Sequence, residues 1–221
     1  MKVEQEGNIS KHKRMILLML FSLALFMFML YSVITKTFFY DVDMWVSTHS
    51  AGMHQPFFNN IVIVITHLNG VIGSTIFTFL LLVYLVYRKW YRDLRFYLFS
   101  FLGASLLFTL IKNIVERARP QSELIDVINY SFPSGHSTMA MAMALSIYFI
   151  FVPKLSSAKG RLLLLIAAMV WPLLIAFTRI YLNVHWVSDT LAGLSLGFFW
   201  VTLMEIFYPR EDTRVKVEVR S

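Results

Sequence analysis

The sequence predicts an all-α membrane protein built as a bundle of six transmembrane helices. Of its 221 residues, 57% are hydrophobic and only 15% are charged, and the mean hydropathy is +0.64. A soluble domain usually carries about 25% charged residues, so an ordinary soluble protein is excluded. The hydrophobic residues also gather in long runs, and a run of about 20 residues crosses a bilayer as a helix. Because no soluble domain, low-complexity tract or repeat is evident, we predict one membrane-embedded domain over residues 1–221.

Six apolar stretches are the expected spans. The first covers residues 15–34 and follows a polar, basic segment. This apolar run is too long for the core of a signal peptide, so no cleavable signal is expected. The other five cover residues 71–87, 96–111, 137–152, 162–178 and 187–208. Pro172 lies within the fifth span, where neighbouring helices can satisfy the carbonyl group that a proline leaves unpaired. Between the first two spans, residues 56–68 are expected to form an amphipathic helix that lies flat in the membrane interface.

The distribution of lysine and arginine predicts the orientation. If both termini are cytoplasmic, most of the 20 cationic residues fall in cytoplasmic segments, as the positive-inside rule requires. The cations left on the outer side are Lys36, Lys112, Arg117, Arg119 and Arg179. The net charge of +7 therefore has a topological origin and does not indicate nucleic-acid binding. Nearly all the outer cations lie in or beside polar motifs, which indicates a separate role for them.

The first polar motif follows the third span. Lys112 and Arg119 are seven residues apart, which is two helical turns, so we expect them to share a helix face about 10 Å apart. Long cationic side chains placed in this way can converge on one phosphate. The alternative is a pair of cations that extend from a helix end to the membrane surface. We assign that surface role to Arg117, which lies between them.

The second motif is Pro-Ser-Gly-His at residues 133–136, directly before the fourth span. Proline and glycine are turn-forming residues, and Ser134 or Ser137 can cap the helix that follows. The free amides and the dipole at a helix start favour an anion. His136 adds a group that can carry a proton at the same place. An isolated match of this kind is most often only a helix cap, so its meaning depends on the other two motifs.

The third motif runs from Thr178 to Asp189 and joins the fifth span to the sixth. His185 and Asp189 are four residues apart and are therefore expected to be neighbours on a helix. A carboxylate in that position can bond one imidazole nitrogen, fix the tautomer and leave the other nitrogen basic. An acid within an apolar span is costly unless it is paired, which favours a functional role. A purely structural bond between the two side chains is the alternative.

Other residues receive packing or local roles. The alternating methionines and alanines of residues 139–144 predict a packed core, and the small residues Gly193 and Gly197 predict a close helix contact. His67 and Asn69 are expected to form local hydrogen bonds near the outer interface. A role for these two residues in lipid gating is the alternative.

Taken in order, Lys-x6-Arg-Pro, Pro-Ser-Gly-His and Arg-x5-His-x3-Asp resemble the motifs of the type 2 phosphatidic-acid phosphatase family of integral membrane lipid phosphatases. The layout of six spans is similar as well. The third motif usually opens with Ser-Arg and here opens with Thr178-Arg179, which keeps the hydroxyl group. Within the family, the sequence looks most like the bacterial phosphatidylglycerophosphatase B-like group.

The resemblance implies a catalytic set and a phosphate-binding set. His185 would be the nucleophile and form a phosphohistidine, and Asp189 would orient it. His136 would protonate the leaving group and then activate water. The phosphoryl oxygens would be bound by Lys112, Arg119, Arg179, Ser134 and the amides near Gly135. No cofactor is expected, and a metal ion held by the two histidines and the aspartate is disfavoured because three nearby cations would repel it.

These features predict a metal-independent lipid phosphatase that hydrolyses phosphate monoester or pyrophosphate head groups at the outer leaflet. Phosphatidylglycerol phosphate, phosphatidic acid and undecaprenyl pyrophosphate are all candidate substrates. The alternative is a non-catalytic lipid-binding or lipid-transport protein on the same fold, which would need the cations but neither imidazole. The expected partners are the lipid substrate and the bilayer. The expected location is the cell membrane, namely the cytoplasmic membrane of a bacterium. The active site is expected on the extracytoplasmic side.

Overall fold

The computed structural model describes residues 2–208 except 51, 53, 122–123 and 126. Within these residues the chain forms helices and no β-strand, which confirms the predicted all-α class. The helices are α1 (Lys2–Thr35), α2 (Phe39–Ser50), α3 (Pro56–Leu68), α4 (Val71–Tyr87), α5 (Tyr91–Val115), α6 (Gly135–Phe151), α7 (Ala158–Tyr181) and α8 (Val187–Phe207), with a short 3-10 turn, η2 (Val152–Lys154), after α6.

The predicted bundle of six spans is confirmed. Among the described residues, five helices are long and apolar enough to cross a membrane, and the consecutive helices α3 and α4 together make a sixth candidate. Several helices extend beyond the apolar runs on which the prediction rested. For example, α5 begins at Tyr91 and ends at Val115, because the polar residues that flank an apolar run can continue its helical hydrogen bonding.

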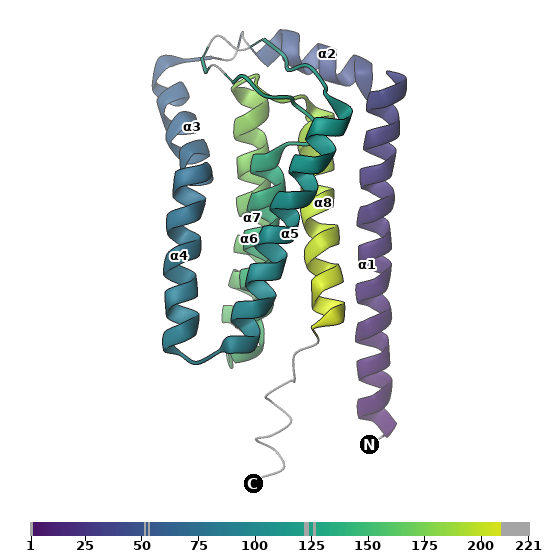
Figure 1. Cartoon of the computed structure of the whole chain (residues 1–221), viewed down its shortest axis with the longest axis vertical. Helices are drawn as coiled ribbons and strands as arrows, with labels where there is room; N and C mark the ends of the chain where they lie inside the picture. Colours follow the sequence, from purple (N-terminus) through teal and green to yellow (C-terminus); the bar gives the residue numbers. More distant parts are fainter. Residues whose placement is uncertain (1, 51, 53, 122–123, 126, 209–221) are drawn as a thin grey trace.

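The segment between the first two spans differs from the prediction. Residues 56–68 do form a helix, but α3 does not lie flat across the bundle. It leads into α4 with a bend of 45°, and the two helices follow the bundle together (Figure 1). Five consecutive aliphatic residues, 61–65, make α3 apolar enough for this position. The helix that crosses the end of the bundle is α2, a segment of mixed polar and aromatic residues for which the sequence predicted no helix (Figure 1).

The centre of the bundle is the contact between α6 and α8. Helix α8 packs most extensively against α1 and α6, and α6 also packs against α5 and α7. A Cβ atom added at Gly193 would lie 2.5 Å from the Ser134 carbonyl oxygen, and one at Gly197 would lie 2.6 Å from that of Thr138. The side chains of residues 139–144 are all buried. The predicted close helix contact and the predicted core are therefore both confirmed.

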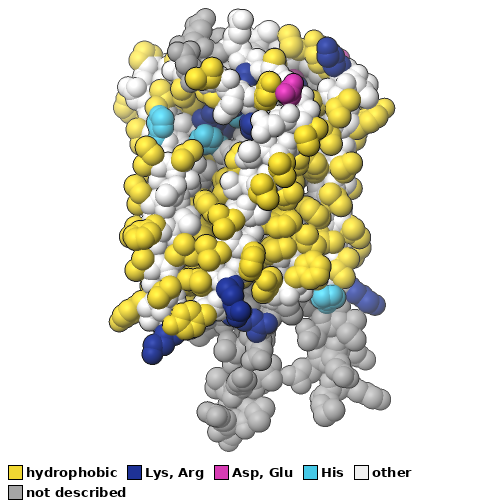
Figure 2. All heavy atoms as spheres, viewed as in Figure 1, with side chains coloured by type: hydrophobic (Ala, Val, Ile, Leu, Met, Phe, Trp, Pro, Cys, Tyr) yellow, Lys and Arg dark blue, Asp and Glu magenta, His cyan; other side chains and the backbone are white. Residues whose placement is uncertain are grey.

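The two ends of the bundle have different chemistry. Helix α1 begins and α8 ends at one end, whereas α2 and the loop between α5 and α6 lie at the other (Figure 1). Figure 2 shows hydrophobic side chains over the flank. Lysine and arginine side chains gather around the end where α1 begins, and others lie near the opposite end. This distribution agrees with the predicted orientation, which stays a prediction. Of the cations on which it rests, those of the C-terminal tail lie outside the described residues: Arg210, Arg214, Lys216 and Arg220.

Candidate active site

The three polar motifs meet at the end of the bundle that α2 crosses. The first motif begins in the last turn of α5 and continues into the loop that follows, the second opens α6, and the third joins α7 to α8 (Figure 1). Lys112, Arg119 and Arg179 all act electrostatically on His185. The same three cations and His185 also act on His136. Three cations and two imidazoles from distant parts of the chain therefore share one region.

His185 and Asp189 make the predicted contact, although they are not neighbours on a helix. Helix α8 begins only after Trp186, so His185 precedes it. Asp189 lies in the first helical turn, and its carboxylate folds back toward the residues before the helix. Its Oδ2 accepts a hydrogen bond from the Trp186 amide at 3.0 Å and lies 3.2 Å from His185 Nδ1. Both partners of this contact are buried.

The neighbours of His185 define its tautomer. A guanidinium group can only donate hydrogen bonds, and Arg119 Nη1 lies 3.0 Å from His185 Nε2, so Nε2 must be the acceptor. Nδ1 then carries the hydrogen and donates it to Asp189. The lone pair of Nε2 consequently faces the cationic region, which is the arrangement that a nucleophile or a base requires.

Burial and charge together keep His185 neutral. Burial is the larger cause, and it lowers the pKa of His185 well below the ordinary value of 6.5. The positive charges of Arg119, Arg179 and Lys112 lower this pKa further. The imidazole therefore retains its lone pair at neutral pH.

Lys112 and Arg119 reach the site by different routes, so the expectation that they share a helix face is wrong. Helix α5 ends at Val115, because Glu116 adopts a left-handed backbone conformation with φ 49° and closes the helix. Lys112 remains in the last helical turn, whereas Arg119 belongs to the loop that follows. Their charges nevertheless act on the same imidazole.

The loop between α5 and α6 holds both of these cations. Lys112 Nζ donates to the Tyr130 carbonyl oxygen at 2.7 Å. Arg119 donates from Nη2 to the same oxygen at 3.0 Å and from Nε to the Asn129 carbonyl oxygen at 2.6 Å. These bonds fix the guanidinium group so that its Nη1 faces His185. A phosphoryl oxygen placed near the imidazole can take over that last donor.

Arg179 is buried in the last turn of α7, with 4% of its surface exposed. Its Nη1 donates to Thr66 Oγ1 of α3 at 2.9 Å, so the bent pair of helices helps to position it. Its Nε is a buried donor for which the described residues supply no hydrogen-bond partner. Buried donors without a partner are rare and call for a ligand or a water molecule. Arg179 therefore has a hydrogen bond to offer to an anion.

The second motif forms the predicted helix cap. Ser134 is the N-cap of α6, and its Oγ accepts a hydrogen bond from the Ser137 amide at 3.4 Å. The Ser134 amide donates to the Asp189 carbonyl oxygen at 3.0 Å, which joins the start of α6 to the first turn of α8. The next amides, of Gly135 and His136, open the helix and have no partner within it. They are the amides that this helix start can present to an anion.

Arg117 is not the surface cation that the sequence suggested. Its side chain is only 15% exposed, and its guanidinium group lies between two carboxylates. Nη1 is 2.6 Å from Asp189 Oδ1, and Nη2 is 2.8 Å from Asp43 Oδ2. Asp43 belongs to α2 and lies 74 positions before Arg117, so no local pattern connects them. The only signal in the sequence was an aspartate within a segment rich in aromatic residues.

Asn69 contacts more distant parts of the chain than the sequence suggested. Its Nδ2 donates to the His136 carbonyl oxygen at 3.0 Å, and its Oδ1 accepts from Trp171 Nε1 at 3.3 Å. It therefore joins the bend between α3 and α4 to both α6 and α7. The expectation of a purely local role for Asn69 is therefore wrong. His67 is exposed, and a local hydrogen bond for it stays a prediction.

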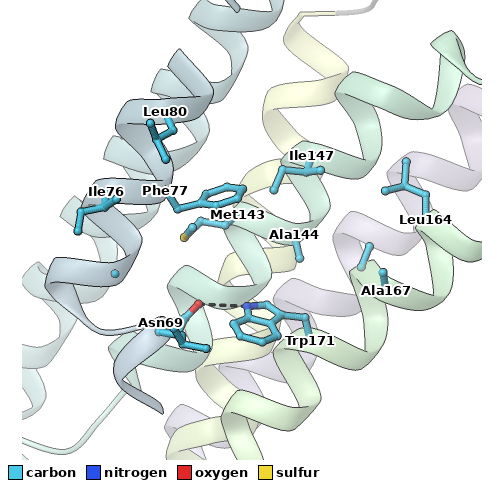
Figure 3. Close-up of a pocket in the computed structure, with 13 residues that line it drawn as sticks. Asn69, Ile76, Phe77, Leu80, Met143, Ala144, Ile147, Leu164, Ala167 and Trp171 are labelled. Carbon is cyan, nitrogen blue, oxygen red and sulfur yellow. Dashed lines mark hydrogen bonds between the residues drawn. The ribbon is translucent and has the colours of Figure 1, made fainter. Parts of the chain in front are cut away.

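An apolar cavity of about 590 Å³ lies between α4, α6 and α7, and Asn69 and Trp171 stand at one end of it (Figure 3). Its walls are almost entirely hydrophobic. The residues labelled in Figure 3 along these walls include Ile76, Phe77, Leu80, Met143, Ala144, Ile147, Leu164 and Ala167. Because Asn69 also bonds to His136, the cavity begins next to the helix start that carries the second motif.

A metal centre was the competing interpretation of the two histidines and the aspartate. In the part of the chain that the structure describes, no group of three or more His, Cys, Asp or Glu side chains is placed to hold a metal ion. Asp189 instead uses its oxygens on Arg117, Trp186 and His185. Metal independence itself stays a prediction.

Known proteins share this sequence pattern. The profile of the PAP2 superfamily matches residues 93–212, which contain all three motifs. The chain is 33% identical to phosphatidylglycerophosphatase B of Bacillus subtilis over 202 residues, or 88% of this chain and 95% of that protein. It is 29% identical to the lipid A 1-phosphatase of Rhizobium johnstonii, over 57% of this chain and 51% of that protein. An undecaprenyl-diphosphatase of Sulfolobus acidocaldarius is 30% identical over 35% of this chain and 33% of its own length.

Solved structures share the arrangement of helices. The crystal structure of a transmembrane PAP2 type phosphatidylglycerolphosphate phosphatase from Bacillus subtilis matches with a TM-score of 0.75 and 31% sequence identity, over 84% of this chain and 94% of that chain. The crystal structure of Aquifex aeolicus LpxE matches with a TM-score of 0.60 and 19% identity, over 74% of this chain and 94% of that chain. The second likeness concerns the fold alone.

Proposed function

We propose that this chain, which belongs to the PAP2 superfamily, is a membrane lipid phosphatase that works on the extracytoplasmic leaflet through a phosphohistidine. The observation that carries the proposal is the orientation of His185. Asp189 holds its Nδ1, and the lone pair of Nε2 faces a group of cations. A protein that only binds or transports lipid phosphates needs the cations but not a buried, neutral and oriented imidazole. The phosphatase is therefore favoured over the non-catalytic alternative.

In the first step, His185 Nε2 attacks the phosphorus of the head group. A nitrogen–phosphorus bond forms as the bond from phosphorus to the lipid oxygen breaks. The bound anionic head group offsets the cations around His136, so that His136 can hold a proton. It gives this proton to the lipid oxygen, and the lipid leaves as an alcohol, or as a lipid monophosphate if the substrate is a pyrophosphate. Asp189 keeps the Nδ1 hydrogen bond and stabilises the positive charge that develops on the ring.

In the second step, neutral His136 takes a proton from water, whose oxygen attacks the phosphorus. The nitrogen–phosphorus bond breaks, inorganic phosphate leaves, and both histidines return to their starting states. Lys112, Arg119 and Arg179 neutralise the phosphoryl charge in both steps, and the Nε of Arg179, which has no partner among the described residues, supplies one hydrogen bond. Arg119 exchanges its bond to His185 for one to a phosphoryl oxygen.

The substrate is a lipid with a terminal phosphate or pyrophosphate. The polar site binds the head group, and we place the apolar tail in the cavity between α4, α6 and α7, which starts at Asn69 (Figure 3). The relative that covers most of both chains is a phosphatidylglycerophosphatase B. Phosphatidylglycerol phosphate is therefore the first substrate to test, beside phosphatidic acid and undecaprenyl pyrophosphate.

The decisive experiment measures phosphate release from these three lipids by the purified protein in detergent. We expect release from at least one of them, and none after His185→Ala, because no other group in the site is oriented to attack. A short incubation with ³²P-labelled substrate, followed by acid-sensitive and alkali-stable labelling of the protein, reports the phosphohistidine. His67→Ala, which changes an exposed histidine, is the matched control. Turnover that survives in His185→Ala would refute the proposal.

Metal removal tests the charge neutralisation assigned to the cations. We expect chelation of divalent ions to leave turnover unchanged, because three cations already neutralise the phosphoryl group. Vanadate, which resembles the transferring phosphoryl group, should inhibit. Activity that disappears with the chelator and returns with added metal would overturn the metal-independent mechanism.

Single cysteines test the orientation, since the native chain has none. Lys36 lies between α1 and α2 at the end that carries the site, and Ser157 lies in the loop before α7 at the opposite end (Figure 1). We expect Lys36→Cys to react with a membrane-impermeant reagent in intact cells and Ser157→Cys to react only after lysis. The reverse pattern would place the site on the cytoplasmic side.

A further inference from the structure

We propose that Asp43 and Arg117 are positioning residues of the catalytic site: with Asp189 they form a charge network that holds the catalytic carboxylate and sets the charge that His185 meets. The inference rests on the proposed phosphohistidine mechanism. Asp43 lies outside the three motifs, and Arg117 falls within the first motif but was assigned only a surface role from the sequence. Their role follows from contacts between α2, the loop after α5 and the first turn of α8.

The guanidinium group of Arg117 is the centre of the network. Nη1 donates to Asp189 Oδ1 at 2.6 Å and to Ser188 Oγ at 2.7 Å, and Nη2 donates to Asp43 Oδ2 at 2.8 Å. The Trp186 ring covers it, with the guanidinium carbon 5.2 Å from the ring centroid. Arginine suits this position because its planar fork can serve two carboxylates at once, which the point charge of a lysine cannot do.

Asp43 anchors the network to α2. Its Oδ1 accepts a hydrogen bond from the Ser188 amide at 3.0 Å, and its Oδ2 accepts one from the Ser188 hydroxyl at 2.5 Å. Its side chain is 2% exposed, so these bonds form away from water, where such contacts are strong. Ser188 directly precedes Asp189, and therefore Asp43 restrains the same helical turn that carries the catalytic carboxylate.

The network divides the two oxygens of Asp189 between different tasks. Oδ1 faces Arg117, whereas Oδ2 faces the Nδ1 of His185 and the Trp186 amide. Arg117 therefore acts on the imidazole only through the carboxylate. Its fork is occupied by carboxylate and hydroxyl oxygens, so phosphate binding is left to the other cations.

The charges of the network explain why both residues are needed. One guanidinium between two buried carboxylates leaves one negative charge next to His185. When Nε2 bonds to phosphorus, the ring becomes positively charged, and this remaining negative charge stabilises it. Without Arg117, two buried carboxylates would share a site, and a proton taken up by Asp189 would remove the negative charge that faces the His185 ring. Without Asp43, Arg117 would cancel the charge of Asp189, and the positive ring would lose its stabilisation.

The test compares Asp43→Asn and Arg117→Lys with Asp41→Asn, which changes an exposed aspartate of the same helix. Rapid-quench labelling with ³²P-lipid measures the rate of phosphoenzyme formation, and steady-state assays give kcat and KM. We expect Asp43→Asn and Arg117→Lys to slow labelling about 10- to 100-fold, the effect of losing a hydrogen bond to a charged group in the transition state. KM should change by less than about threefold, because no group that contacts the substrate is removed. Asp41→Asn should match the wild type.

A double variant separates a network from two independent structural roles. Residues that act as one unit show non-additive effects. The loss in the Asp43→Asn, Arg117→Lys double variant should therefore not exceed that of the worse single variant. Losses that multiply, or that fall mainly on KM, would overturn the positioning role.

The outcomes also separate this inference from the proposed function. Absence of a labelled His185 in the wild type refutes the phosphohistidine mechanism and this inference with it. Normal labelling in the wild type, with unchanged rates in Asp43→Asn and Arg117→Lys, refutes the positioning role alone. If either variant does not fold, Ser188→Ala decides, because it removes only the hydroxyl that bridges Asp43 and Arg117. A lower labelling rate with unchanged KM in Ser188→Ala supports the network, and an unchanged rate overturns it.

Discussion

The charged site and the apolar cavity both border on α6, yet they are built in opposite ways. In the site, polar side chains are held by hydrogen bonds from other elements, and Asp189, for example, bonds to Arg117, Trp186 and His185. The cavity is an open volume of about 590 Å³ with hydrophobic walls. This difference agrees with the roles that we propose for the two regions. Phosphoryl transfer requires atoms to be held closely in place, whereas an apolar tail requires room and few directional contacts.

The same contrast appears in how α6 packs on its two sides. Toward α8, glycines let the two backbones approach until a carbonyl oxygen occupies the space of a missing Cβ atom. Toward α4, the helices stand apart and leave the cavity between them (Figure 3). A change on the tight side should therefore disturb the chemistry, and a change on the open side should disturb only the fit of the tail.

The largest effect is expected from Gly193→Ala, which forces the tight side apart. The new Cβ atom would lie 2.5 Å from the Ser134 carbonyl oxygen, which is part of the backbone and cannot rotate away. We expect most of the phosphatase activity to be lost and the unfolding temperature to fall, since overpacking costs about 1–3 kcal/mol. Phosphate release and thermal unfolding in detergent measure both effects.

Gly160→Ala is the control for that change, because the nearest atoms to its Cβ would lie at 3.8 Å. Alanine is a better helix former than glycine by about 1 kcal/mol, so this control should be neutral or stabilising. If the two variants behave alike, the close approach of α6 and α8 does not maintain the site.

The second prediction concerns the pH dependence that the cations impose. Attack requires neutral His185, so kcat/KM falls as the pH drops through its pKa, which burial and Arg119 hold well below 6.5. Arg119→Gln removes a positive charge, raises the pKa of His185 and moves the acid limb to higher pH. It should also lower kcat by about 10²–10³, the usual effect of losing a donor to the transition state.

Profiles of kcat/KM against pH for the wild type and Arg119→Gln measure this shift, and the ionisation of the substrate is common to both. Arg88→Gln, at the opposite end of the bundle, should leave the limb in place. If kcat/KM of Arg119→Gln falls at the same pH as that of the wild type, or at a lower pH, the assigned contact between Arg119 and His185 is contradicted.

A smaller effect is expected on the open side. Ala167 lines the cavity and is exposed, so Ala167→Phe fills part of the volume without overpacking the core (Figure 3). We expect KM for a long-chain lipid to rise about tenfold, equivalent to two methylene groups that lose their burial. A short-chain analogue should be hydrolysed as before. Leu165→Phe, an exposed position on the same helix outside the cavity, is the control, and an equal rise there would contradict a tail site.

The smallest effect is expected at the border between the two regions. Asn69→Ala leaves the His136 carbonyl oxygen and the Trp171 indole without their partner. Each buried group that loses its hydrogen bond costs about 1–3 kcal/mol, so the unfolding temperature should fall while catalysis drops only a few-fold. Long-chain and short-chain substrates should be affected equally. A loss confined to long-chain lipids would show that Asn69 acts through contact with the tail and not through these two hydrogen bonds.

The sequence predicted well wherever the determinants are local. Each span is a predominantly apolar stretch of the sequence, and the membrane requires little else of a helix. The cap at Ser134 depends on residues within one turn, and so does the contact between His185 and Asp189. The family resemblance found in the three motifs is confirmed by the match to residues 93–212.

The sequence failed where distant residues or unusual backbone decide. Lys112 and Arg119 were placed on one helix because nothing marks the end of α5. Glycine is the usual residue in the left-handed conformation that closes a helix, and here a glutamate, Glu116, adopts it. Arg117 was assigned to the surface because its partner Asp43 lies on α2, which only the assembled bundle brings near.

The bond between Asp43 and Ser188 spans 145 positions of the chain, and this distance has a consequence for synthesis. The ribosome delivers α2 early and α8 last among the described helices. Until α8 inserts, Asp43 and Arg117 lack the helical turn on which they act, and the proposed nucleophile has no carboxylate to orient it. Before α8 inserts, a growing chain would therefore carry the phosphate-binding cations without an oriented nucleophile. In that state it would not hydrolyse the lipids around it.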